Sequence, residues 1–110
     1  MPGPFQRVLI AGPSMAPGLR HGDAVVVRRG GRVRPGDVVL ARFPALPDRL
    51  VVKRAVRPYG AGWWVEGDNP YASDDSRRYG AAAVLGRVIW RYHPEDRRGP
   101  LGRRGAGRCW

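Results

Sequence analysis

The sequence is short of the residues from which covalent and metal cross-links are made. Its 110 residues include one cysteine, Cys109, and two histidines, His21 and His93. A lone cysteine excludes an intrachain disulfide framework and gives no sign of an oxidising compartment. One Cys and two His also fail to complete an ordinary structural zinc site.

Long apolar runs are missing as well. The longest uncharged stretch, Val8 to Leu19, has 12 residues and is interrupted by two prolines and two glycines. A membrane-spanning helix needs about 20 residues of apolar character. No charged segment followed by an apolar leader and a small-residue cleavage site precedes this stretch. These absences predict a soluble, cytoplasmic protein without a transmembrane helix.

Lysine is scarce in a strongly basic chain. Lys and Arg together number 20 against 9 Asp plus Glu, which gives a net charge of +11, and Lys53 is the single lysine. Such a charge attracts nucleic acid and other polyanions, whereas a genomic preference for arginine would produce the same excess without such a partner. The lone lysine stands out chemically, because Lys loses its proton far more readily than Arg.

The abundance of glycine and proline, 16 and 11 residues, favours short strands joined by turns over long helices. The length suits one compact, mainly β domain of short antiparallel strands, over residues 1–93. From residue 94 to 110 the chain holds five Arg and two acids and is predicted to be a basic, disordered tail.

Runs of β-branched and apolar residues predict the individual strands, with a turn at Gly30-Gly31 between the second and the third. A short helical turn is expected at Ala81–Leu85. The predicted strands are Gln6–Ile10, Asp23–Arg28, Gly36–Arg42, Leu50–Val56, Gly62–Glu66 and Arg87–Tyr92.

Lys53 lies within the fourth of these runs. Alternation along a strand places Val51, Lys53 and Ala55 on one face. Burial between apolar neighbours lowers the pKa of an ammonium group, and a neutral amine serves as a general base near neutral pH. The alternative is a surface lysine whose stem lies along apolar neighbours while its charge stays in water.

A general base needs a group to deprotonate, and Ser14 is the best candidate. It lies in the irregular loop of residues 11–18, where unpaired backbone N–H groups can stabilise an oxyanion. The alternative is an ordinary turn. A second polar loop, residues 67–80, is typical of side-chain turn networks, but one of its hydroxyls could orient a neutral lysine.

Four segments together resemble the sequence boxes of the type I signal peptidases, serine proteases with a Ser–Lys dyad. The segment from Ser14 to Leu19 is similar to the nucleophile box. Gly22-Asp23 followed by Val25 and Val27 resembles the next box, and Lys53-Arg54 resembles the box of the general base. The last box is matched by Gly67-Asp68-Asn69, Ser73, Asp75-Ser76-Arg77 and Gly80. The resemblance covers roughly residues 8–92, with the boxes in the family's order.

The resemblance implies a role for each matching residue. Ser14 would be the nucleophile, Lys53 its neutral general base, and Ser73 the hydroxyl that orients the amine. The backbone N–H of Ser14 would form the oxyanion hole, with Gly12 where many members carry a second, hydroxyl donor. Met15 would line a pocket for a small substrate residue. Asp75 and Arg77 would form a structural ion pair, and no metal or other cofactor would be needed.

Local sequences such as Gly62–Ala72 look most like the soluble proteases that mature nickel-type superoxide dismutase. That likeness implies an endopeptidase that removes the N-terminal extension of the dismutase precursor. One alternative is signal-peptidase-type processing of exported proteins. Another is an inactive member that only binds peptides. A third alternative, of a different functional class, is a basic β-barrel that binds nucleic acid. Its aromatic residues would be Tyr59, Trp63, Trp64, Tyr71, Trp90 and Tyr92.

Overall fold

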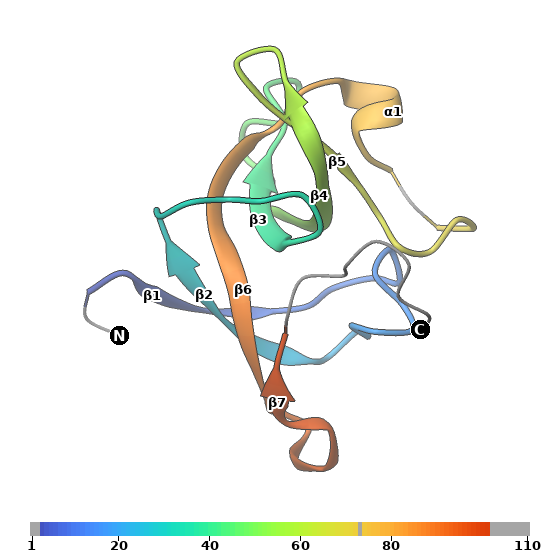
Figure 1. Ribbon diagram of the computed structural model, residues 1–110. Coiled ribbons are helices and arrows are strands. Elements are labelled where there is room, and N and C mark those ends of the chain that lie inside the picture. Colours follow the sequence, from blue (N-terminus) through green and yellow to red (C-terminus); the bar gives the residue numbers. More distant parts are fainter. Residues whose placement is uncertain (1–2, 73, 102–110) are drawn as a thin grey trace.

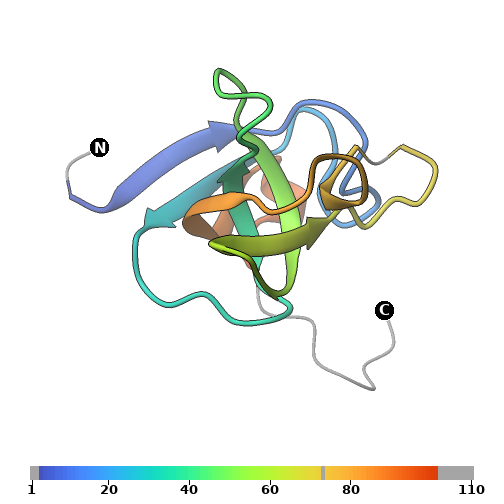
Figure 2. The same cartoon turned by 90° about the horizontal axis from the view of Figure 1, so that it is seen from above.

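The computed structural model describes residues 3–72 and 74–101 and shows a seven-stranded antiparallel sheet that curls into a partly closed barrel (Figures 1 and 2). The mainly β prediction is confirmed, and each predicted strand overlaps an observed one. The strands are β1 (Phe5–Leu9), β2 (Ala24–Arg29), β3 (Val38–Arg42), β4 (Val51–Tyr59), β5 (Gly62–Glu66), β6 (Ala83–His93) and β7 (Gly99–Pro100).

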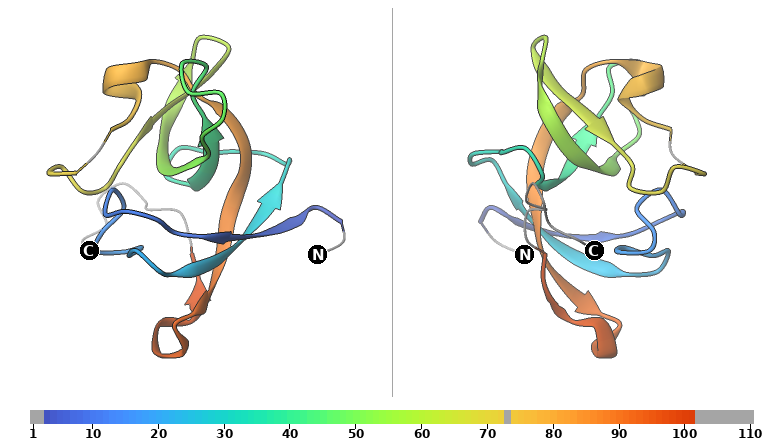
Figure 3. Two further views of the ribbon diagram at one scale, coloured as in Figure 1. Left: turned by 180° about the vertical axis from the view of Figure 1, so that it is seen from behind. Right: turned by 45° about the vertical axis from the view of Figure 1, so that its right-hand side comes forward.

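The long strand β6 lies at the centre of the sheet. The spatial order is β1-β2-β6-β3-β4-β5, and β7 pairs with the far end of β6 (Figure 3). The Gly30-Gly31 segment thus connects β2 and β3 without making them neighbours, because β6 is inserted between them. Residues distant in sequence therefore meet across the sheet.

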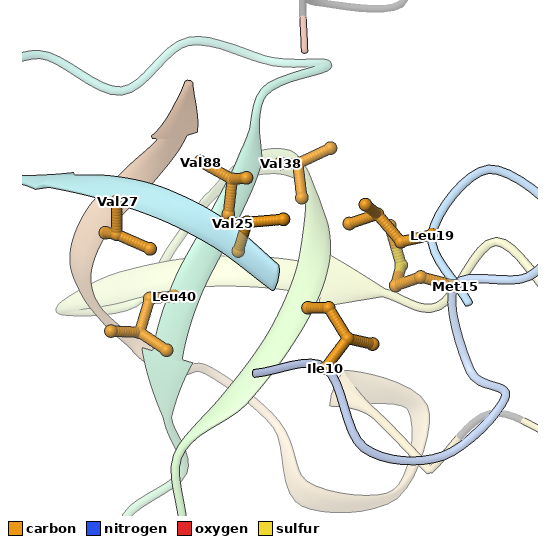
Figure 4. Close-up of a cluster of buried hydrophobic side chains, with 8 residues drawn as sticks. All are labelled: Ile10, Met15, Leu19, Val25, Val27, Val38, Leu40 and Val88. Atoms are coloured by element: carbon orange, nitrogen blue, oxygen red, sulfur yellow. The ribbon is translucent and has the colours of Figure 1, made fainter. Parts of the chain in front are cut away.

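Two clusters of buried side chains hold the sheet together. The first core packs Ile10, Met15 and Leu19 of the loop before β2 against valines and leucines of β2, β3 and β6 (Figure 4). The second core contains Val39, Ala41 and Phe43 together with residues of β4 and β5. Strand β3 contributes to both cores, since Val38 and Leu40 face the first while Val39 and Ala41 face the second. Alternation of side chains along one strand thus joins two cores.

The structure differs from the sequence prediction in its helix. The expected turn at Ala81–Leu85 is wrong, because Ala82 bridges to Trp63 and strand β6 has begun by Ala83. The helix is α1 (Ser76–Tyr79), which Asp75 caps by accepting the backbone N–H of Arg77 at 3.1 Å. A capping carboxylate satisfies a backbone donor that a helix start leaves unpaired.

The segment after residue 93 also differs from the prediction. Composition predicts a disordered tail from Pro94, but Glu95–Arg97 form a short 3-10 helix and Gly99–Pro100 add strand β7. Composition missed this order because it follows from tertiary contacts of Arg97, described below. The remainder of the predicted tail, residues 102–110, lies outside the described residues.

Glycine is required at position 86, in the middle of β6. A Cβ atom there would lie 2.6 Å from the carbonyl oxygen of Arg28, a backbone atom that cannot move away freely. We expect Gly86→Ala to reduce the free energy of unfolding by about 1–3 kcal/mol, the usual cost of overpacking. The control is Gly18→Ala, whose Cβ would meet its nearest atom at 3.8 Å. Equal denaturation midpoints for the two variants would contradict the close approach.

Candidate active site

Ser14 lies half-buried on the loop that joins β1 and β2. The loop is folded on itself, since the N–H of Ala16 donates to the carbonyl of Pro13 and the N–H of Leu19 donates to that of Met15, both at 3.0 Å. Met15 and Leu19 are each 2% exposed and anchor the loop in the first core. The hydroxyl-bearing residue is therefore presented by a loop with a fixed conformation.

Asn69 fastens this loop to the polar loop that follows β5. Its backbone N–H donates to the carbonyl of Ser14 at 2.8 Å, and its side-chain amide donates to the carbonyl of Pro13 at 3.0 Å. The two loops lie side by side at one edge of the molecule in every view (Figures 1–3). Asn69 thus sets the position of the backbone on both sides of the Pro13–Ser14 peptide bond.

A second fastening comes from the C-terminal segment. Asp23, 2% exposed, accepts the guanidinium of Arg97 at 3.0 and 3.1 Å and the backbone N–H of Arg20 at 2.9 Å. Arg97 also donates to the carbonyl of Gly18 at 2.9 Å, and Arg91 of β6 donates to the same carbonyl at 2.6 Å. We call Asp23, Arg91 and Arg97 the Asp23 clamp. It ties the second half of the Ser14 loop to β6 and to the segment after it.

Lys53 is buried, with 4% of its surface exposed, at the register position of strand β4 opposite Val39. Val51 and Ala55, on its own face, pack with the second core, as alternation predicts. Burial lowers the pKa of the Lys53 ammonium below its ordinary value, because the charged form loses its hydration. Of the two sequence-based alternatives, the structure has the buried lysine.

Neighbouring charges act on Lys53 in both directions. The carboxylates of Asp75 and Asp74 favour the ammonium and raise its pKa, while the guanidinium groups of Arg49 and Arg77 lower it. Desolvation is the largest of these effects, and the pKa remains lowered. The site therefore favours a neutral amine more than water does.

Asp75 is 1% exposed and is held by Arg77. The guanidinium donates to its two carboxylate oxygens at 3.0 and 2.7 Å, and the N–H of Gly67 donates at 2.9 Å. Burial alone would raise the pKa of Asp75, but these hydrogen bonds outweigh burial and the pKa lies below its usual value. Asp75 is thus an anion whose charge is largely matched by Arg77.

Arg54, the neighbour of Lys53, faces the opposite way and braces the same polar loop. It makes two hydrogen bonds to Asp68, at 3.2 and 2.6 Å, and a third to the carbonyl of Gly36 at 3.0 Å. A paired guanidinium–carboxylate contact is geometrically specific as well as strong. Strand β4 therefore fixes the polar loop through Arg54 and carries Lys53 on its other face.

A cavity of about 320 Å³ brings the principal candidates together. Ser14, Met15 and Gly12 line one side of it, and Lys53 lines another. Apolar side chains of β1 and β4, together with Leu40, form much of the remaining wall. Ser14 and a buried lysine of lowered pKa thus line the same cavity, and a hydroxyl and a neutral amine are the groups that base-assisted nucleophilic attack needs.

Other candidates have different positions. Ser73, expected to orient the Lys53 amine, lies outside the described residues. The N–H of Gly12 donates to Nδ1 of the exposed His21 at 3.0 Å, a contact that no sequence spacing suggested. The roles of Asn69 and Arg97 were also missed. Asn69 lies within a recognised box, but nothing in the sequence links Arg97 to Asp23, 74 residues away.

Within the part of the chain that the structure describes, no group of three or more His, Cys, Asp or Glu residues is arranged to hold a metal ion. The same residues include no helix long and apolar enough to cross a membrane.

The comparisons with known proteins define the class as S24-like peptidases. The Peptidase S24-like family matches residues 6–89, and the chain belongs to this family. A mitochondrial ATP-independent inner membrane protease subunit 1a of Arabidopsis thaliana is 32% identical, covering 84% of this chain and 73% of that protein. Mitochondrial inner membrane protease subunit 1 is 30% identical in Xenopus tropicalis, covering 86% and 72%, and 28% identical in Homo sapiens, covering 79% and 69%.

These findings correct two expectations. The cytoplasmic location is contradicted, because the relatives are subunits of inner-membrane proteases and point to a membrane location. The absence of an apolar span misled the prediction, since such an absence does not settle where a protein acts. The relatives are also not superoxide dismutase maturation proteases, so processing of that precursor has no support here, and signal-peptidase-type processing agrees better with them.

Burial of Lys53 predicts a pH-dependent change in stability. Replacing it by Met removes a charge that the folded state disfavours, so Lys53→Met should raise the free energy of unfolding at pH 7. The unfolded chain binds more protons than the folded one between the lowered pKa and 10.5. The stability of the wild type therefore rises through that window, and the advantage of the variant should shrink.

Chemical denaturation at pH 7 and at pH 10.5 measures this difference. The control, Arg42→Met, removes an exposed cation from β3 and should change stability by less than about 0.5 kcal/mol. A Lys53→Met protein that is less stable than the wild type at pH 7 would argue against a disfavoured ammonium.

Proposed function

We propose that the chain is a serine endopeptidase in which Ser14 is the nucleophile and Lys53 the general base. The observation that supports this best is the shared cavity, where the Ser14 loop meets a buried lysine of lowered pKa. Family membership supports peptide hydrolysis independently of this geometry.

The reaction follows from the chemistry of the two side chains. The neutral Lys53 amine accepts the proton of the Ser14 hydroxyl while the hydroxyl oxygen forms a bond to the scissile carbonyl carbon. The Lys53 ammonium then gives that proton to the departing amine as the C–N bond breaks, leaving an acyl-enzyme. Water, deprotonated by the same amine, hydrolyses the ester and restores both residues.

The charges around Lys53 suit this cycle. A free carboxylate beside the amine would hold it as an ammonium at neutral pH, whereas Asp75 is matched by Arg77. The transient ammonium still benefits from the two nearby aspartates. The arrangement favours the neutral base at rest and tolerates the cation during the reaction.

We propose that the substrate binds as an extended segment along β1. This strand pairs only with β2 in the described sheet, and residues 8–11, at its end, line the cavity. An added strand gains main-chain hydrogen bonds along such an edge, and side-chain pockets provide selectivity. Met15, Leu40 and Val52 form apolar cavity wall, which suits a small apolar residue before the scissile bond.

The substrate class that we propose is a precursor protein with an N-terminal extension, processed at a membrane in the manner of a signal peptidase. The names of the relatives support this setting, since all three act as protease subunits at an inner membrane. The test is to incubate the chain with precursors of exported proteins and with a nickel-type dismutase precursor, then identify new N-termini by mass spectrometry. Cleavage of the dismutase precursor alone would reverse our choice of substrate.

Removing the proton acceptor should abolish cleavage without unfolding the protein. We expect kcat/KM to fall at least ~10²-fold in Lys53→Met and in Lys53→Arg, since Arg keeps the charge but does not readily lose a proton. Ser14→Ala should lose labelling by a serine-directed acylating reagent. A folded Lys53→Arg protein with undiminished activity would eliminate Lys53 as the base. If the reagent does not label the wild type either, the chain is an inactive member that only binds peptides.

The pH dependence should report the charges near Lys53. Activity should rise with pH through the apparent pKa of Lys53, because only the neutral amine accepts a proton. Arg49 lowers that pKa, so Arg49→Gln should raise it and move the activity curve to higher pH. Arg42→Gln, on the exposed end of β3, should leave the curve unmoved. A downward shift in Arg49→Gln would contradict this assignment.

The nucleic-acid alternative receives less support from the aromatic residues. Trp64 packs edge-on against Tyr59 at 5.0 Å between ring centroids and lies under the guanidinium of Arg57, while Trp63 packs on the second core. These rings make contacts within the protein, which favours a packing role over the stacking of bases.

A further inference from the structure

A second cavity, of about 240 Å³, lies at the opposite end of β2 from the Ser14 loop. Four of its six lining residues are arginines, Arg28, Arg32, Arg34 and Arg87, and the other two are Gly30 and Gly31. No acidic residue is among them. We call these four residues the arginine cluster. Two members, Arg32 and Arg34, belong to the segment between β2 and β3, which passes β6 on its way (Figures 1 and 2).

The positive charges of the arginine cluster are not neutralised by carboxylates in the described part of the chain. Elsewhere, Arg54, Arg77 and Arg97 are each paired with a carboxylate. Among the described residues, by contrast, no carboxylate or other acceptor receives a hydrogen bond from the guanidinium groups of the arginine cluster. Arg34 uses its backbone N–H, not its side chain, to contact Asp37. The positive charges of this cavity are therefore left to be balanced from outside.

The strand register places two arginines of the cluster side by side. Arg28 of β2 and Arg87 of β6 are direct partners across the antiparallel pair, so their side chains leave the same face next to each other. Like charges in directly opposed positions destabilise a sheet. Arg87 is half-buried, whereas Arg28 is exposed. A genomic preference for arginine explains their number, but it does not explain why unpaired arginines gather around one cavity.

The loop that carries the other two arginines is anchored at both ends. The N–H of Gly30 donates to the carbonyl of Leu85 in β6 at 3.1 Å, and the N–H of Gly36 donates to that of Ala55 in β4 at 2.8 Å. Gly30 and Gly31 adopt φ angles of 70° and 80°, which let the chain turn sharply beside β6. Arg32 and Arg34 thus belong to a tethered segment and line the same cavity as Arg28 and Arg87.

We propose that the arginine cluster binds a phosphate or diphosphate group. Guanidinium groups are planar, two-pronged donors that match the oxygens of phosphate, and they keep their charge at every physiological pH. A compact dianion or trianion would relieve the repulsion between Arg28 and Arg87 and reach the two loop arginines together. The cavity, of about 240 Å³, is large enough for a diphosphate.

The binding test uses inorganic pyrophosphate as the probe, titrated calorimetrically into the full chain in low and high salt. We expect one saturable site that weakens as salt is added. Arg28→Gln/Arg87→Gln should bind at least about tenfold more weakly, since charged hydrogen bonds are lost. The control is Arg7→Gln/Arg42→Gln, which removes the same charge from exposed positions outside the cavity. Absent binding at low salt, or equal losses in both variants, overturns the proposal.

Thermal unfolding separates a ligand site from a structural role. Without ligand, Arg28→Gln/Arg87→Gln should be at least as stable as the wild type, because a like-charge pair is gone. Pyrophosphate should raise the Tm of the wild type and of Ser14→Ala but not that of the double variant. A double variant that melts well below the wild type without ligand would show that the arginines support the fold and would contradict the proposal.

Vesicle sedimentation identifies where the phosphate comes from. Binding to phosphatidylglycerol vesicles but not to phosphatidylcholine vesicles, lost in Arg28→Gln/Arg87→Gln and displaced by pyrophosphate, assigns it to an anionic lipid headgroup. Pyrophosphate binding without vesicle binding assigns it to a soluble phosphate compound. Binding of single-stranded DNA that pyrophosphate does not displace would instead mean an extended polyanion and would overturn the compact site.

Discussion

The burial of Lys53 is the constraint to which the rest of the site is adjusted. An ammonium loses its hydration inside the barrel, and that loss lowers its pKa more than the nearby aspartates raise it. The balance depends on Arg77, which binds Asp75 through two hydrogen bonds and leaves less of its charge for the lysine. The Asp75–Arg77 pair therefore acts on the lysine as well as on the loop.

The opposite side of the cavity is held by contacts to backbone carbonyls. Asn69 donates hydrogen bonds to the carbonyls of Pro13 and Ser14, and the arginines of the Asp23 clamp donate to the carbonyl of Gly18. Carbonyl contacts fix the path of the chain whatever side chains the loop carries. Part of this support comes from Arg97, which lies beyond the residues that match the family. This chain thus uses its C-terminal segment to complete a scaffold that the shared domain begins.

Two groups of arginines have different physical roles. Those near the candidate site, such as Arg54 and Arg77, are paired with carboxylates and fix loops. Those at the far end of β2 gather around a cavity and face one another without a counter-ion among the described residues. The net charge of +11 therefore does not describe a uniformly basic surface.

The sequence by itself determined the strand class and the positions of most strands, and its resemblance to the signal peptidases singled out a loop serine and the only lysine as candidates. The strands depend on local alternation and on turn residues, which are readable along the chain. Local patterns did not reveal that β6 separates β2 from β3, that residues 94–101 are ordered, or that Arg97 reaches Asp23. Nor did they show that Arg28 opposes Arg87. Only the tertiary structure decided these points, because register and long-range ion pairs depend on which segments meet when the sheet closes.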